Sequence, residues 1–228
     1  MGKEVGAVKD MAIDLSSRLT SLLNPSVWQS QERLLAELGS IFTGFAGGRI
    51  KNMLKELYER KDIDEKILDS EKGKQSFIDL IRFVTQENPD VDTWESAKRI
   101  FVRTLEKDTK EQERASLYNL LSICKELSGP EIKIISGSYK IYQKVENNEY
   151  KEGEQHHNIG RWASEVAQLI GFETNEEVLR YEDNLIKQKL ISPVEQLRGD
   201  AQVTFSAGGC RTHRLTPLGL KLSKSFIS

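Results

Sequence analysis

The chain has 228 residues, of which 38% are hydrophobic, 30% are charged and 7% are aromatic. Its 33 basic and 35 acidic side chains leave a formal net charge of −2 at pH 7. This length is enough for one large domain or two small ones with a buried core. The near-neutral balance excludes a globally basic nucleic-acid coat and an acidic tail protein, and the regular apolar spacing argues against wholesale disorder.

Cysteine usage and the N-terminal residues bear on the cellular compartment. The two cysteines, Cys124 and Cys210, lie far apart and do not have the spacing of metal ligands, which favours a reducing environment over a secreted disulfide framework. The first residues lack the basic start and apolar core of a signal peptide. We therefore expect a cytoplasmic protein.

Residues 34–48 form the most apolar segment of the chain. The uncharged part, residues 38–48, is too short for a membrane-spanning helix, which needs about 20 residues. Its helical spacing fits a face that packs against other helices, which is the favoured interpretation, or a helix that lies on a membrane surface. The apolar positions are Leu34, Leu35, Leu38, Ile41, Phe42 and Phe45.

The first half of the chain reads as a series of helices. Apolar spacing of three or four residues predicts helices over residues 5–23, 28–60, 76–84, 93–105 and 110–127. The second is interrupted by glycines, and we expect a turn at residues 47–48. Asp92 or Thr93 is expected to cap the helix that begins near residue 93. The charged segment 61–74 is predicted to be a solvated helix or a loop.

The sequence changes character at Ser128, where we place a boundary between an N-terminal helical region, residues 1–127, and a second domain, residues 128–228. Ser128, Pro130 and Glu131 are typical of a helix start, and this helix is predicted over residues 131–145. A polar insert, residues 146–158, follows it. We then expect helices over 159–170 and 175–189, strands over 203–205 and 211–216, and a last helix over 217–227.

This order, a helix, a helix-turn-helix, a β-hairpin and a closing helix, is that of a winged helix-turn-helix domain. The stretch HRLTPLGLKLSKSF resembles the end of many such domains, and WASEVAQLIGF followed by LRYEDNLIKQKLIS resembles their second and third helices. We therefore predict a mainly α fold: a helical N-terminal region followed by a winged-helix-like C-terminal domain with a small β-hairpin.

In such a domain the helix over residues 175–189 would enter the DNA major groove. It carries four acids and three bases, and its first turn is acidic, which suits the helix dipole but repels phosphate. Residues 125–228 hold 14 bases and 14 acids, and the only local excess is +4 in the last eighteen residues. The candidate DNA contacts are Arg180, Asn184, Lys187, Arg198, Arg211 and Arg214.

Candidate catalytic and metal-binding patterns are weak. The glycines near residue 47 lack the Lys-Ser/Thr pair of a phosphate-binding loop. The adjacent His156 and His157 would point to opposite sides of an extended chain. Cys210 lies near His213, but nothing marks an oxyanion hole. We predict no catalytic residue, no cofactor and no metal site, and therefore not an enzyme.

A second resemblance covers roughly residues 32–227. The stretch RLLAELGSIFTGFAGGRIKNMLKELYERK, then LYNLLSICKELSGPEIKIIS, then LTPLGLKLSKSF resembles the Abi-alpha family of bacterial abortive-infection and mobile-element proteins. The resemblance implies a helical N-terminal half, a winged-helix-like end and a setting in phage defence or a mobile element. It implies no catalytic residues.

Three functions follow as expectations. The leading one is a non-enzymatic protein-interaction protein that contacts a protein partner or a second copy of itself, with the winged helix as a packing module. The alternative is a winged-helix DNA-binding transcriptional regulator that uses the helix over 175–189 and the wing from Arg198 to Arg214. The third is a membrane-surface effector that acts through residues 34–48. No small-molecule substrate is evident.

Overall fold

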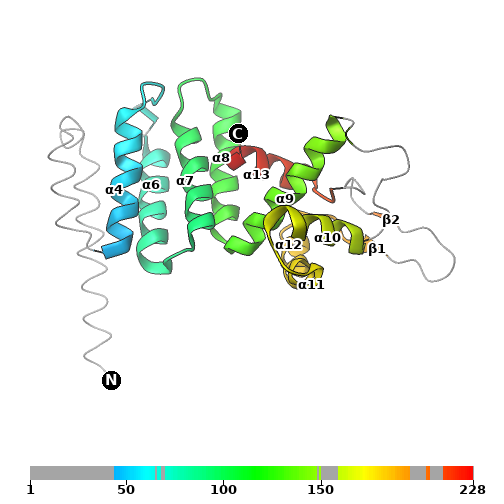
Figure 1. The fold of residues 1–228 in the computed structure, drawn as a ribbon. Coiled ribbons are helices and arrows are strands. Elements are labelled where there is room, and N and C mark those ends of the chain that lie inside the picture. Colours follow the sequence, from blue (N-terminus) through cyan, green and yellow to red (C-terminus); the bar gives the residue numbers. More distant parts are fainter. Residues whose placement is uncertain are drawn as a thin grey trace. The chain divides into compact units, whose positions relative to one another are not determined.

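The computed structural model describes residues 44–64, 66–67, 70–147, 149, 159–195, 204–205 and 213–227. The structure is mainly helical, which confirms the predicted fold class at this level (Figure 1). The chain divides into two compact units: unit 1, Met1–Pro89 with Phe101–Tyr118, and unit 2, Asp90–Ile100 with Asn119–Ser228. The domain boundary expected at Ser128 stays a prediction. The helix expected over residues 5–23 and the first part, residues 28–43, of the helix expected over residues 28–60 lie outside the described residues.

Unit 1 contains α4 (Gly44–Glu59), α6 (Glu71–Arg82) and the π-helix η1 (Phe83–Glu87), together with the end of α7 (Val91–Leu105) and the start of α8 (Glu111–Lys125). The turn expected at residues 47–48 is wrong, because α4 runs through both glycines. Its buried stripe keeps the helical spacing throughout. That stripe consists of Ile50, Met53, Leu54 and Leu57.

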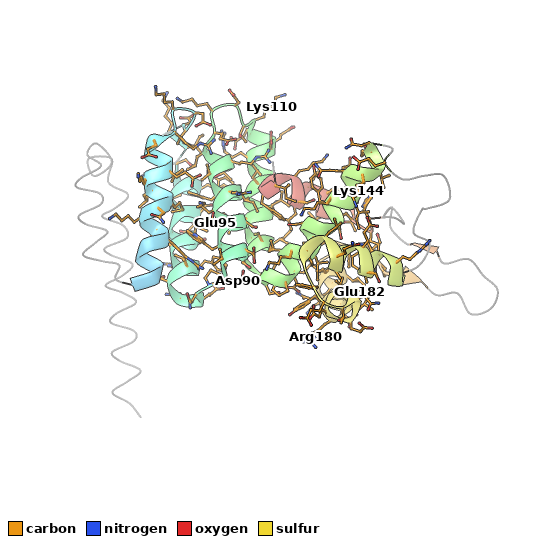
Figure 2. The ribbon with its side chains drawn as sticks, in the orientation of Figure 1. Asp90, Glu95, Lys110, Lys144, Arg180 and Glu182 are labelled. Carbon is orange, nitrogen blue, oxygen red and sulfur yellow. The ribbon has the colours of Figure 1, made fainter. Side chains whose placement is uncertain are left out.

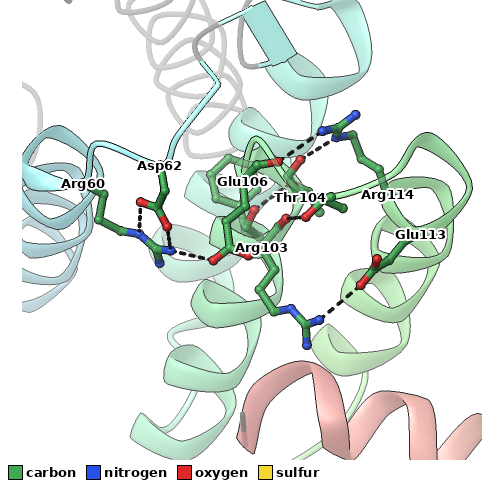
Figure 3. Close-up of polar contacts among 9 residues, drawn as sticks. Arg60, Asp62, Arg103, Thr104, Glu106, Glu113 and Arg114 are labelled. Carbon is green, nitrogen blue, oxygen red and sulfur yellow. Dashed lines mark hydrogen bonds and ion pairs between the residues drawn. The ribbon is translucent and has the colours of Figure 1, made fainter.

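The loops at one end of unit 1 are held together by arginines (Figure 3). Arg60 bonds both Asp62 and Glu106. The hydrogen bond from Arg60 is the main reason why the pKa of Asp62 falls to about 2. Arg114 is buried and donates to the carbonyl oxygens of Thr104 (2.8 Å) and Glu106 (3.3 Å). These contacts satisfy carbonyl groups where α7 ends.

In unit 2, the start of α7 and the start of α9 (Gly129–Glu146) share one carboxylate. Asp90 Oδ1 accepts from the Thr93 N–H (2.9 Å), and Oδ2 accepts from the Gly129 N–H (2.7 Å). The expectation that Asp92 or Thr93 caps α7 is therefore wrong: the helix begins two residues earlier, and Asp90 supplies the cap. The predicted Ser128 start is confirmed, since Glu131 accepts from both the N–H and the hydroxyl of Ser128.

The Asp90→Ala change is expected to lower the free energy of unfolding by about 1–2 kcal/mol, because it removes the cap of two helices. Urea denaturation measures this. Asp92→Ala is the matched control: Asp92 pairs with Lys133 at a well-exposed position, and such pairs contribute about 0–1 kcal/mol. Equal losses in the two variants would contradict the shared cap.

Unit 2 continues with α10 (Ile159–Ile170), α11 (Asn175–Arg180), α12 (Glu182–Lys187) and α13 (Pro217–Ile227). The limits predicted for α10 and α13 are confirmed. The single helix expected over residues 175–189 is wrong: it breaks at Tyr181, whose N–H turns back to the Val178 carbonyl three residues earlier. α10 packs against α9 and α11, and α13 packs against α9.

Two short strands follow α12. β1 (Val194–Glu195) pairs antiparallel with β2 (Thr204–Phe205). The expectation of a strand over residues 211–216 is wrong for its described part, residues 213–216, where Leu215 forms an isolated bridge with Ile191. The physical reason lies next to the bridge: Arg214 has a φ of 57°, in the left-handed region, which interrupts an extended strand.

Candidate functional site

The interior of unit 2 contains a buried arginine, Arg214, whose side chain has no solvent exposure. Its Nη2 donates to Glu182 Oε1 (2.6 Å) and to the Ser192 carbonyl (2.7 Å), and its Nε donates to the same carbonyl (3.2 Å). Its guanidinium carbon lies 4.4 Å from the ring centroid of Trp162. One side chain thus ties α10, α12 and residue 192 to the segment before α13. We call Trp162, Glu182, Ser192 and Arg214 the Arg214 centre.

The charge inside the Arg214 centre is balanced, but its hydrogen bonds are incomplete. Arg214 Nη1 and the Ser192 hydroxyl oxygen are buried without a hydrogen-bond partner. Such groups cost stability because they lose water without gaining an acceptor or a donor. Burial lowers the pKa of Arg214, and the nearby Glu182 acts in the opposite direction. Glu182 is therefore the group that makes this buried cation tolerable.

His213 is also buried, with 4% exposure. Its Nδ1 accepts a hydrogen bond from the Leu215 N–H (3.0 Å), so the side chain closes a turn around Arg214. The imidazole meets the Tyr142 ring edge-on, with ring centroids 5.2 Å apart. Tyr142 also stacks on Tyr139, and the Lys224 ammonium lies over the Tyr142 ring. His213 therefore supports the backbone conformation that directs Arg214 inward.

The structure separates the candidate DNA contacts. Arg180 and Lys187 are exposed at the ends of α11 and α12, and Figure 2 shows Arg180 in this part of unit 2. The Asn184 amide instead bonds Glu131, which is buried. The guanidinium of Arg214 is buried and is enclosed by Glu182, Ser192 and Trp162. Arg198 and Arg211 lie outside the described residues.

The surface of α11, α12 and the residues beside them has no positive excess. Between residues 173 and 189, the exposed charged residues are three acids and three bases, a net charge of zero. A helix that enters the major groove gains most of its affinity from basic groups next to phosphates. The exposed charges between residues 173 and 189 therefore cancel and give no net positive field. The exposed acids are Glu173, Glu176 and Asp183, and the exposed bases are Arg180, Lys187 and Lys189.

In the described part of the chain, no group of three or more His, Cys, Asp or Glu side chains is placed to hold a metal ion. The same residues contain no helix that is both long and apolar enough to cross a bilayer. His156, His157, Cys210 and residues 34–43 lie outside them.

Cys124 is buried in α8, and burial raises the pKa of its thiol to about 12. Since the thiolate is the reactive form, burial leaves Cys124 almost entirely as the unreactive thiol at pH 8. We expect iodoacetamide to leave Cys124 unmodified in the native protein at pH 8, as measured by mass spectrometry of its peptide. Labelling in denaturant is the control. Native labelling at the rate of a free thiol would contradict this burial.

The Arg214 centre was missed at the level of sequence. Its members come from four separate segments, and no local spacing joins Trp162 to Glu182, Ser192 and Arg214. An arginine in a polar stretch is ordinarily a surface residue. Comparison with known proteins adds nothing to this picture: no protein-family model matches the chain, and no curated protein or solved structure is significantly similar to it.

Proposed function

We propose that this protein is a non-enzymatic protein-interaction protein, in which unit 2 is a winged-helix-like packing module rather than a reader of DNA. The observation that carries the proposal is the position of Arg214. Arg214, one of the six candidate DNA contacts, is instead engaged in internal bonds to Glu182 and Ser192.

The electrostatics of α11 and α12 support the same proposal. Arg180 and Lys187 are the candidate DNA contacts that remain exposed, and neighbouring acids cancel them. Asn184, which would read a base edge by its amide, already bonds Glu131. A packing module needs a specific shape more than a positive field, and the buried polar contacts of unit 2 are consistent with that role.

The partner-binding segment in this proposal is the apolar stretch of residues 34–48. Among the described residues, Val91 is the only large hydrophobic side chain that is exposed. A single apolar residue does not make a docking surface. In the sequence, the helical spacing of Leu38, Ile41 and Phe45 predicts an apolar face, and a second copy of the chain is the simplest partner for it.

Sedimentation velocity of the full chain over a wide concentration range tests self-association. We expect the wild-type protein to associate and Ile41→Glu to weaken this association, because a carboxylate in an apolar contact must be desolvated. Lys51→Glu is the matched control, since Lys51 is an exposed residue of α4. Wild-type protein that stays monomeric at every concentration would overturn the proposal.

DNA binding is the second candidate, and the order of elements in unit 2 favours it: α9, α10, α11 with α12, the β1–β2 pair and α13 follow the winged-helix order. Gel retardation of random duplex DNA at about 50 mM salt separates the two candidates, because phosphate contacts are strongest at low salt. We expect no retardation. Retardation that Arg180→Ala with Lys187→Ala removes would favour a DNA-binding regulator.

The cellular setting that we propose is phage defence or a mobile element in the bacterial cytoplasm. Its support is the resemblance of residues 32–227 to the Abi-alpha family. The test is to infect cells that carry or lack the gene and to compare the number of plaques that phages form on each. Equal plaque numbers for a panel of phages would count against it.

A further inference from the structure

Two polar atoms of the Arg214 centre are shielded from solvent without gaining a hydrogen bond inside the protein. Among the described residues, neither Arg214 Nη1 nor the Ser192 hydroxyl oxygen has a partner, and both atoms are buried. Other bonds join these two residues closely: the Ser192 N–H donates to the Arg214 carbonyl (2.8 Å), and Arg214 Nε and Nη2 donate to the Ser192 carbonyl. The two unpaired atoms therefore belong to one tightly connected pair of residues.

Other buried hydroxyls of unit 2 find their partners within the chain. Those of Thr216 and Ser223 each donate to a backbone carbonyl, and that of Ser138 accepts from Trp162 Nε1 (3.2 Å). The ring face of Trp162 attracts the Arg214 cation, but it gives Nη1 no oxygen to which it can donate. Because buried polar groups are paired with protein or with ordered water in the great majority of cases, a bound molecule is the expected source of the missing hydrogen bonds.

The charge and the burial of the Arg214 centre define the kind of molecule that fits. Arg214 already pairs with Glu182 (2.6 Å), so a bound anion would bring a negative charge without a counter-charge into a buried site, which is costly. The molecule must therefore be neutral, small enough to be enclosed, and able both to accept from an N–H and to bond a hydroxyl. Water meets all three conditions, and a buried water typically makes about three hydrogen bonds to such unpaired groups.

We propose that the Arg214 centre binds one buried water molecule. The water oxygen accepts from Arg214 Nη1, and one of the water protons is donated to the Ser192 hydroxyl oxygen. This links the side chains of two residues whose backbones are already bonded beside the bridge between Ile191 and Leu215. The water thus completes the hydrogen bonds of a buried arginine whose charge is already balanced by Glu182.

A crystal structure of the full chain, grown in the presence of sodium bromide, identifies the bound molecule. We expect electron density for a single oxygen atom within hydrogen-bond distance of both Arg214 Nη1 and Ser192 Oγ, and no anomalous bromine signal at that position. A bromine peak beside Nη1 would overturn the proposal, because the centre would then bind an anion. A dry centre, or an oxygen atom of the chain itself at that position, would overturn it as well.

Magnetic relaxation dispersion of oxygen-17 counts the water molecules that tumble with the protein in solution. We expect Ser192→Ala to hold one such water fewer than the wild type, because a water bonded to Nη1 alone lacks the second partner that retains it. Ser223→Ala is the matched control: it removes a buried hydroxyl that already bonds the Gly219 carbonyl, so the count should not change. Equal counts in the wild type and Ser192→Ala would overturn the proposal, as would an equal loss in the control. The crystal result does not depend on self-association, so it stands apart from the test of the proposed function.

Discussion

Arg214→Ala is expected to lower the free energy of unfolding by about 3–5 kcal/mol, because breaking a buried ion pair leaves the other charge without its partner. Glu182 has 15% of its side chain exposed, so water can compensate it only in part. The change also removes the guanidinium from the face of Trp162 and leaves the Ser192 carbonyl without its donor. Urea denaturation, followed by circular dichroism, measures the loss.

The double variant Arg214→Met with Glu182→Leu tests the reason for this loss. Replacing a buried pair by apolar side chains of similar volume is often neutral or stabilising, so we expect it to recover most of the stability lost in Arg214→Ala. Lys221→Ala is the matched control, since Lys221 is an exposed base of α13 and such substitutions change stability by about 0.5 kcal/mol or less. A loss in Arg214→Ala as small as in Lys221→Ala would show that the guanidinium is solvated.

The helices that could be predicted from sequence are those with strong local end signals. α10 ends just before Gly171, whose φ of 78° suits a residue without a side chain. α13 begins at Pro217, where the missing N–H costs nothing, and the Thr216 hydroxyl accepts from the Gly219 N–H. Ser128 and Glu131 mark the start of α9 in the same way. In each case the residues that decide the boundary lie within four positions of it.

The features that sequence reasoning missed depend on contacts between distant segments. The second bond of the Asp90 carboxylate, to the N–H of Gly129 39 residues further along the chain, could not be predicted, because nothing local brings these two residues together. The break at Tyr181 was hidden because Val178 and Leu185, seven residues apart, are both buried, as they would be in one helix. For the same reason the inward position of Arg214 could not be read from its polar neighbours.

Gly219→Ala is expected to lower the free energy of unfolding by about 3 kcal/mol, because overpacking in a fixed position costs about 1–3 kcal/mol or more. An added Cβ would collide with the Leu190 carbonyl oxygen and lie 3.1 Å from Leu215 Cδ2. The carbonyl cannot move away easily, since it accepts from the Thr216 N–H. The helix preference of Ala, about 0.5–1 kcal/mol, offsets only part of this cost.

Gly48→Ala is the matched control within α4, because Gly48 is exposed and nothing lies within 4 Å of an added Cβ. There the same substitution should raise the free energy of unfolding by about 0.5–1 kcal/mol. Urea denaturation measures the change in the free energy of unfolding for each variant. A loss at Gly219 and a gain at Gly48 would separate the effect of close backbone packing from that of helix propensity. If Gly219→Ala also stabilises the protein, then α13 does not pack against the Leu190 carbonyl, and the bridge between Ile191 and Leu215 cannot hold as described.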